Sequence, residues 1–452
     1  MEDKKKDLYW IKSGFINIIQ NFSGVLLGFA SFYVLVRLLS KNDFGIWTLF
    51  MSTLTILEAI RSGLIQNALI KFISSSDKEH HRDITTASFA ISGVVSIISV
   101  IAIFIFAPFL SKLWDSPELT SLLYVYTIIY LFSGVQAQFN AVEQANLRYN
   151  GIFIAGLVKQ MTFFCFILVC YIFSFEIKLI YLVWVQIFSA FVAMILAYSF
   201  VRHHITLSIQ ISRSWVQKLF GYGKYAFGTL ISSLLSSTID QMMLGAMLSP
   251  AASGAFNIAV RITNLIDIPG NAIATIVFPQ SAKRMEAGGT SAVKYLYEKS
   301  VGTTLALVLP VVLFLYLFSD IVITTIAGDK YKDSIPLLQV TLLYCLLIPF
   351  GRQFGNILDS IGKTRTTFLV VLLTASLNLT LNYLFISRIG VMGAAYATLC
   401  SNLIGFIIAQ VILKREINVN FLNTFVYAYK FYPEFLNKYI RPYWIKRSFK
   451  NS

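Results

Sequence analysis

The sequence predicts an all-α, polytopic membrane protein whose twelve transmembrane helices form two six-helix lobes around a central cavity. Three observations predict this fold. The composition is 56% hydrophobic and only 13% charged, whereas soluble domains are about a quarter charged. Apolar runs of membrane-spanning length recur along the whole chain. A short stretch near residue 40 returns near residue 249, which indicates two copies of one unit.

Each predicted span is an apolar run that reaches the roughly 20 residues needed to cross a bilayer core. Because lipid offers no hydrogen-bond partners to the backbone, and the runs lack strand-like alternation, we expect each to be a helix. The four cysteines lie inside these runs without metal-ligand spacing, and we interpret them as packing residues rather than metal ligands or disulfides. The spans are 13–36, 43–72, 84–111, 119–145, 150–173, 178–201, 219–247, 251–280, 301–326, 335–359, 366–387 and 391–413.

The second and eighth spans begin with the same motif, a Leu-Ser pair followed at fixed spacing by glycine, one residue and an aromatic side chain. The copies are "LSKNDFGIW" from residue 39 and "LSPAASGAF" from residue 248, which is 209 positions later. We predict that Ser40 is a helix N-cap and that Asp43 completes a capping box. Ser249 is the corresponding cap, and Pro250 takes the first helical position, where no donor is needed. A capping box in the first copy and a proline at the first helical position in the second therefore start a helix at the same place.

Both spans also carry a continuous polar stripe at the same offset. On the second span the stripe consists mainly of small polar residues, with Glu58 at its edge, and Asp267 is the counterpart of Glu58 on the eighth span. Polar groups in a membrane face a partner helix or water. A packing seam explains the second span as well as a cavity does, whereas larger side chains favour a hydrated cavity beside the eighth. Within a sector of about 80°, the eighth span carries Asn257, Arg261, Asn264 and Asn271.

The distribution of cations predicts the orientation. Of 37 Lys and Arg residues, 26 fall at the termini and even-numbered turns and 7 at the odd-numbered turns, which places both termini in the cytoplasm. We therefore divide the chain into an N-terminal lobe at 1–208, a C-terminal lobe at 209–414 and a basic cytoplasmic tail at 415–452. The tail either lies on the anionic leaflet or is disordered, and we expect no nucleic acid partner.

Several further stretches extend the pattern over residues 8–415. They are "DQMMLGAMLSPAASGAFNIAVRITN", "FPQSAKRMEAG", "AGDKYKDSIPLLQV", "SIGKTRTTF" and "LNLTLNYLFISRIGVMGAAYATLCSNLIG". In their order and spacing over twelve spans, the chain resembles the polysaccharide flippases of the multidrug/oligosaccharidyl-lipid/polysaccharide exporter superfamily. Within that superfamily it is most similar to bacterial flippases for repeat units of O-antigen (lipopolysaccharide) and capsule.

This resemblance implies a V-shaped pair of bundles that alternates between inward-open and outward-open states in the bacterial plasma (inner) membrane. The implied substrate is an oligosaccharide on undecaprenyl pyrophosphate, moved from the cytoplasmic to the outer leaflet. The family is not an enzyme family, and we expect no bound cofactor. A polysaccharide polymerase and a chain-length complex are the implied protein partners, besides membrane lipids.

An anionic pyrophosphate head group needs fixed cations at membrane depth, and four residues are candidates. Arg261 is the first, because a guanidinium offers a planar fork to phosphate oxygens. Arg352 follows a proline and a glycine at which the helix can bend. Arg61 lies away from the polar stripe and close to Glu58, so an internal ion pair is an equal alternative. Lys159 contacts the head group or snorkels to the surface.

Amides and acids complete the predicted site. Asn257, Asn264 and Asn271 are candidates for binding the sugar. The candidates for coupling to a proton or sodium gradient are Glu58, Asp240, Asp267 and Asp359. Charge balance is the alternative role for these acids, and for Arg261 it takes the form of an ion pair with Asp240 or Asp267.

Two rival functions remain open at this stage. A cation-coupled exporter of drugs or metabolites from the same superfamily would carry an acid in the first span, and no acid lies between Asp7 and Asp43. An integral membrane polysaccharide polymerase or ligase would show similar hydropathy, but needs a sizeable loop on the outer face. The predicted outer turns are short.

Overall fold

The computed structural model describes residues 23–437, except for the side chains of residue 64 and residues 223–237. Across this range the regular structure is helical, and no strand occurs among these residues. The chain divides into two compact units, Met1–Gly254 and Ala255–Ser452. The boundary between the units differs from the predicted lobe boundary at 208/209, and the division into duplicated lobes stays a prediction.

Unit 1 contains the helices of the first seven predicted spans. The second span, predicted as one helix over 43–72, is divided into two α-helices by a short π-helix. The described part of the first span is a helix at Ser23–Leu38, and residues 13–22 of that span lie outside the described residues. The others are α2 (Lys41–Arg61), the π-helix η1 (Ser62–Gln66), α3 (Asn67–Ser75), α4 (Lys78–Leu113), α5 (Glu118–Ala145), α6 (Asn150–Ile172), α7 (Leu179–Val201) and α8 (Arg213–Met247).

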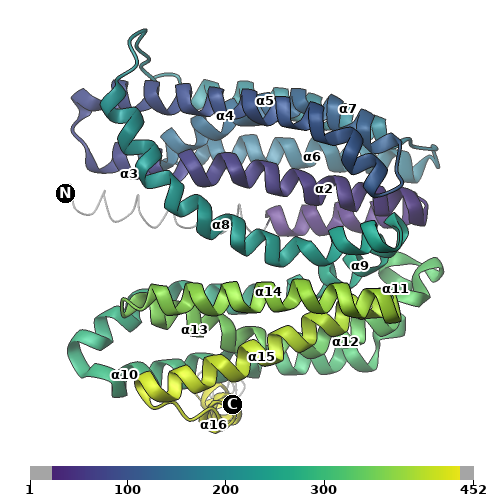
Figure 1. Ribbon diagram of the computed structural model, residues 1–452, viewed down its shortest axis with the longest axis vertical. Helices are drawn as coiled ribbons and strands as arrows, with labels where there is room; N and C mark the ends of the chain where they lie inside the picture. Colours follow the sequence, from purple (N-terminus) through teal and green to yellow (C-terminus); the bar gives the residue numbers. More distant parts are fainter. Residues whose placement is uncertain (1–22, 438–452) are drawn as a thin grey trace, which may run out of the picture. The chain divides into compact units, whose positions relative to one another are not determined.

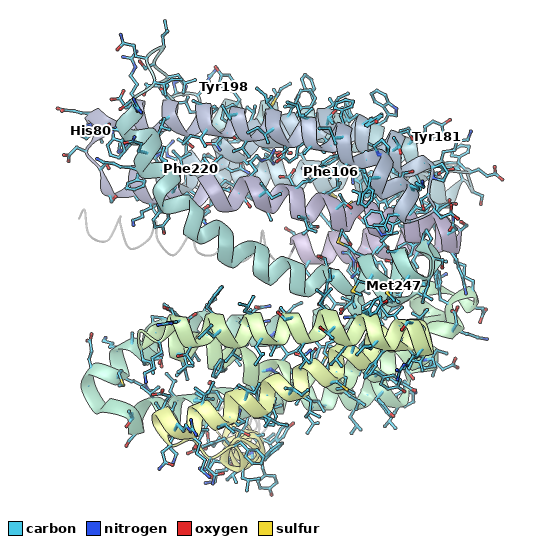
Figure 2. The ribbon with its side chains drawn as sticks, viewed as in Figure 1. His80, Phe106, Tyr181, Tyr198, Phe220 and Met247 are labelled. Atoms are coloured by element: carbon cyan, nitrogen blue, oxygen red, sulfur yellow. The ribbon has the colours of Figure 1, made fainter. Side chains whose placement is uncertain are left out.

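Helices α4 to α7 pack side by side in unit 1, and α8 runs along α2 and η1 (Figure 1). The apolar side chains of Phe106, Tyr181 and Tyr198 are 57%, 50% and 52% exposed (Figure 2). Large exposed apolar side chains on long helices are the expected surface of a protein that meets lipid. The molecule is a multi-pass membrane protein.

The two copies of the repeated motif meet each other in unit 1. The Ser40 hydroxyl accepts a hydrogen bond from the Asp43 amide at 3.1 Å, and the Ser249 hydroxyl accepts one from the amide of Ala252 at 3.2 Å. Both predicted helix starts are confirmed. A Cβ built on Gly254 would lie 3.0 Å from the Cα of Gly45, so the conserved glycine of each motif is the point at which the two helix starts touch.

Unit 2 is built from α10 to α16 and most of α9 (Pro250–Ile266). The 50-residue α10 would be about 75 Å long if straight, but Gly289 has a φ of 62° inside it and divides it in two. The two parts belong to the eighth and ninth predicted spans. The elements are α10 (Ile268–Leu317), α11 (Ser319–Ala327), the 3₁₀-helix η2 (Asp329–Ser334), α12 (Ile335–Cys345), α13 (Ile348–Ser360), α14 (Thr364–Ile389), α15 (Val391–Ile417) and α16 (Leu422–Phe435).

The last helix, α16, docks on the second part of α10. Glu298 on α10 is 2% exposed, and its carboxylate accepts hydrogen bonds from the Asn420 amide at 2.9 Å and the Asn423 side chain at 3.0 Å. Gly302 is one turn further on, where a Cβ would come within 3.0 Å of the backbone nitrogen of Ala428. Part of the predicted basic tail is therefore an ordered helix fixed by a buried carboxylate.

Within residues 23–437, nine helical segments are long and apolar enough to cross a membrane. The count treats α10 as one segment and leaves out the helix Ser23–Leu38, which is shorter than the rest. The all-α multi-pass architecture is confirmed, whereas the number of twelve spans stays a prediction.

Candidate functional site

Among the described residues, an acid–arginine cluster lies at a break in a membrane helix in each unit. In unit 1 the cluster lies at the end of α2, where the π-helix η1 begins directly after Arg61. Arg61 is 2% exposed and forms an ion pair with Glu58, whose side chain is 37% exposed. The cluster therefore has a buried cationic side and a half-exposed carboxylate side.

Helix α5 supplies the remaining partners of this cluster. The Arg61 guanidinium donates to the Tyr130 carbonyl at 2.6 Å and lies 4.5 Å from the centre of the Tyr130 ring. The Ser133 hydroxyl accepts from Arg61 at 3.2 Å and donates to Glu58 at 2.8 Å. The Tyr126 hydroxyl also donates to Glu58, at 3.0 Å. The described partners of the Arg61 guanidinium therefore all lie within unit 1. This arrangement matches the internal ion pair that the sequence offered as an alternative to head-group binding.

Lys159 on α6 lies within electrostatic range of both Glu58 and Arg61. The structure therefore brings three of the predicted site residues of unit 1 together. The group contains two basic side chains and one carboxylate.

In unit 2 the cluster joins the start of α10 to α13. Asp267 is the N-cap residue of α10 and forms an ion pair with Arg352 on α13. The side chains of Arg352 and Asp267 are 29% and 20% exposed. Asn271 accepts from Arg352 and donates to Asp267 at 3.3 Å. The structure thus pairs Asp267 with Arg352.

The two clusters are related by the repeat. Glu58 and Asp267 are separated by the same 209 positions as the two helix starts. In each unit the carboxylate lies at an interruption of a membrane helix: η1 follows α2, and α9 ends one residue before Asp267. The arginine differs in origin, because Arg61 comes from the same helix as its acid and Arg352 comes from a neighbouring one. The position of the acid is therefore repeated, while its partner is not.

The predicted polar stripe of the eighth span lies largely on the surface of its helices. Arg261 and Asn264 on α9 are exposed, as is Asn271 on α10, whereas Asn257 is 8% exposed. The corresponding stripe on α2 is more buried, and there the Ser52 hydroxyl donates to the Gln241 side chain on α8 at 3.1 Å. The second span thus uses part of its stripe as a packing seam.

The remaining predicted acids lie apart from these clusters in the chain. Asp240 is 6% exposed on α8. Asp359 lies in the last turn of α13, two turns beyond Arg352, and its Oδ1 atom has no hydrogen-bond partner among the described residues.

Sequence reasoning missed the aromatic and hydroxyl partners on α5. Tyr126, Tyr130 and Ser133 follow one another at helical spacing of four and three residues, so they share one face of the helix. That spacing was the available signal, but aromatic residues on membrane helices are so common that it did not stand out. The link between Asp267 and Arg352 spans 85 positions, and no local pattern indicates it.

The comparisons with known proteins agree with this architecture. The family model described as "Polysaccharide biosynthesis protein" matches residues 34–336. The uncharacterized membrane protein MJ1068 of Methanocaldococcus jannaschii is 24% identical over 415 residues, covering 86% of this chain and 82% of the relative. The lipopolysaccharide biosynthesis protein WzxC of Escherichia coli is 22% identical over 393 residues, covering 85% of this chain and 75% of the relative.

Among solved structures, the fold is similar to that of the lipid II flippase MurJ in an inward closed conformation. The TM-score is 0.74 at 14% sequence identity, and the match covers 91% of this chain and 89% of the other. At this level of identity the likeness establishes the fold.

Proposed function

Because the chain belongs to the polysaccharide biosynthesis protein family, we propose that it is a flippase that moves lipid-linked oligosaccharides across the membrane by alternating access. The proposed substrate is an oligosaccharide repeat unit on undecaprenyl pyrophosphate, taken from the cytoplasmic to the outer leaflet. WzxC is named for lipopolysaccharide biosynthesis and MurJ for flipping lipid II, and both names support this substrate class.

The observation that carries the proposal is the exposed polar stripe on α9 and α10. A cation and two amides at Arg261, Asn264 and Asn271 lie exposed on helices of a membrane protein. Such groups are costly against lipid and persist where they meet water or a polar ligand. A glycan linked to pyrophosphate supplies both the negative charge for the arginine and the hydroxyl groups for the amides.

The clusters have different proposed roles. Arg352 gives donors to Asp267 and Asn271, and both partners can be exchanged for phosphate oxygens when Asp267 takes up a cation or proton. Arg61 reaches substrate only after Glu58 releases it, so Lys159 is the better cation in unit 1. Asn257 extends the amide row toward the start of α9. A proton or sodium gradient acting on Glu58, Asp240, Asp267 or Asp359 would drive the cycle.

The cellular setting is also part of the proposal. We place the protein in a bacterial plasma membrane with both termini in the cytoplasm, as the distribution of cations predicts. It acts as a transporter without chemical turnover of its substrate. A polymerase with its chain-length complex would use the flipped repeat units on the outer side.

The test is transport of a lipid-linked oligosaccharide by the protein reconstituted in vesicles. We expect Arg261→Ala to abolish transport and Arg261→Lys to retain part of it, because lysine keeps the charge but not the fork. Arg388→Ala is the matched control, since Arg388 is an exposed arginine in the last turn of α14. Full activity of Arg261→Ala removes this residue from the mechanism. Transport of cationic drugs without transport of the lipid-linked sugar assigns the chain to the exporter class instead.

A further inference from the structure

Helix α13 carries buried polar atoms without partners, and those of Gln353 and Asn356 have no role in the proposed function. Gln353 is 1% exposed, and neither its amide nitrogen nor its amide oxygen has a hydrogen-bond partner among residues 23–437. The same holds for the Nδ2 atom of Asn356, the Oδ1 atom of Asp359 and the Nε atom of Arg352. Buried polar groups are almost always satisfied by protein or by ordered water, so this set of atoms requires an explanation.

These side chains lie on one face of α13. At 100° per residue, positions 352, 353, 356, 359 and 360 fall within a sector of about 120°. The apolar residues Phe350, Phe354 and Ile357 lie outside that sector and pack in the hydrophobic core of unit 2. The polar face extends over the nine residues from 352 to 360, or about 12 Å along the helix axis.

Each end of the polar face contacts α10 or its N-cap residue. At one end is the ion pair of Arg352 with Asp267. At the other end the Ser360 hydroxyl donates to the Ser281 hydroxyl at 2.7 Å. The polar atoms without partners at Gln353 and Asn356 lie between these two contacts along the helix.

Helix α14 packs on α13 beside the polar face, at Gly355. The Thr367 methyl group lies 3.7 Å from where a Cβ on Gly355 would be, so the first turn of α14 packs on α13. The Thr367 hydroxyl has no hydrogen-bond partner within the described part of the chain.

We propose that this face of α13 binds a file of ordered water molecules that runs from the Asp267–Arg352 pair to the turn after Ser360. A buried water makes about three hydrogen bonds, and the amides of Gln353 and Asn356 offer donors and acceptors along the way. The file gives the Asp267 carboxylate an aqueous route for protons through the interior of unit 2. This inference requires only the membrane fold and stands independently of the proposed substrate.

The file is tested by placing single cysteines at Gln353 and Asn356 and measuring their protection by Ag⁺ in reconstituted vesicles. Ag⁺ reaches thiols through water and does not dissolve in lipid. After quenching and denaturation, the thiols left unprotected are alkylated and counted peptide by peptide, without substrate present. Phe354→Cys is the matched control, because it lies beside Gln353 on the apolar face and is 3% exposed. The native Cys170, 6% exposed, is an internal control.

We expect the cysteines at 353 and 356 to be protected at least about tenfold faster than the one at 354, since a dry site must wait for local opening. Rates less than about tenfold above the Phe354→Cys rate, at every variant that elutes as a monodisperse protein, would overturn the proposal. A single cysteine variant that elutes as a monodisperse protein is enough to decide.

The melting temperature of Gln353→Met gives a second measurement. If the face of α13 is dry, this substitution raises Tm because it removes two unpaired polar atoms. If the face binds water, Tm falls.

Discussion

Replacing Gly45 by alanine tests whether the contact between the two repeated motifs belongs to one conformation of the protein only. A Cβ at this position would lie 2.7 Å from the backbone nitrogen of Ala251 and closer still to the Pro250 carbonyl group. Ordinary van der Waals contact begins at 3.4 Å. The start of α2 must therefore move by at least about 0.7 Å from its neighbour, and both sides of the contact are backbone, which yields less than a side chain.

Overpacking of this kind costs about 1–3 kcal/mol. If the contact exists in one conformation only, the substitution destabilises that conformation alone. An energy of about 1–3 kcal/mol then lowers its population relative to the other conformations by about 5- to 150-fold. Gly254→Ala should shift the balance less, because its Cβ would lie 3.0 Å from Gly45. Gly28→Ala is the control, since no heavy atom lies within 4 Å of its position.

The shift can be measured with a cysteine at Thr48, which lies about two turns into α2 and is 4% exposed. Its reaction with a water-soluble maleimide reports how often this end of α2 opens. We expect the rate to rise in the Gly45→Ala background by the same factor as the population, and to stay unchanged with Gly28→Ala. A rate in Gly45→Ala within twofold of the Gly28→Ala rate would refute the reasoning.

Three further substitutions have defined outcomes. Arg352→Ala should lower the free energy of unfolding by about 1–3 kcal/mol, because it leaves Asp267 partly buried without its cation. In a thermal melt, the double variant with Asp267→Asn should recover part of this loss. If the effects of the two substitutions on stability are strictly additive, the pairing is contradicted. Tyr130→Phe removes a hydroxyl that donates to the Ser99 hydroxyl at 3.1 Å and to the Leu57 carbonyl at 3.2 Å. The free energy of unfolding should fall by about 1–2 kcal/mol, while transport persists because the ring stays over Arg61. An unchanged melting temperature would count against these hydrogen bonds. Glu298→Ala should release α16 and speed proteolysis between α15 and α16, as judged by mass spectrometry; wild-type cleavage kinetics would show that the carboxylate does not hold that helix.

The helix starts were predictable because their signals are local. Ser40 and Ser249 each lie just before the helix they cap, and capping depends on side chains within three residues. The apolar runs predicted the helices for the same reason. The interruption at Ser62–Gln66 was not predictable, because a π-helix needs only one extra residue per turn and leaves the apolar periodicity almost unchanged.

The candidate site was predictable in its residue types but not in its pairings. The positions of Glu58 and Asp267 at the same offset followed from the repeat. For Asp267 the sequence offered Arg261, six positions away, as the alternative partner, whereas the structure selects Arg352. Such a choice depends on how helices pack, and packing between distant segments is not encoded in local periodicity.

The packing of α16 on α10 has a practical consequence for the design of truncated or tagged variants of this protein. The carboxylate of Glu298 receives both of its described hydrogen bonds from residues beyond α15. A truncation directly after Ile417 would remove these donors, and a fusion partner placed there would displace them; either change leaves the buried carboxylate without its described hydrogen bonds. Affinity tags and reporter domains therefore belong downstream of Phe435, and expression trials that trim the C-terminus should keep the whole of α16.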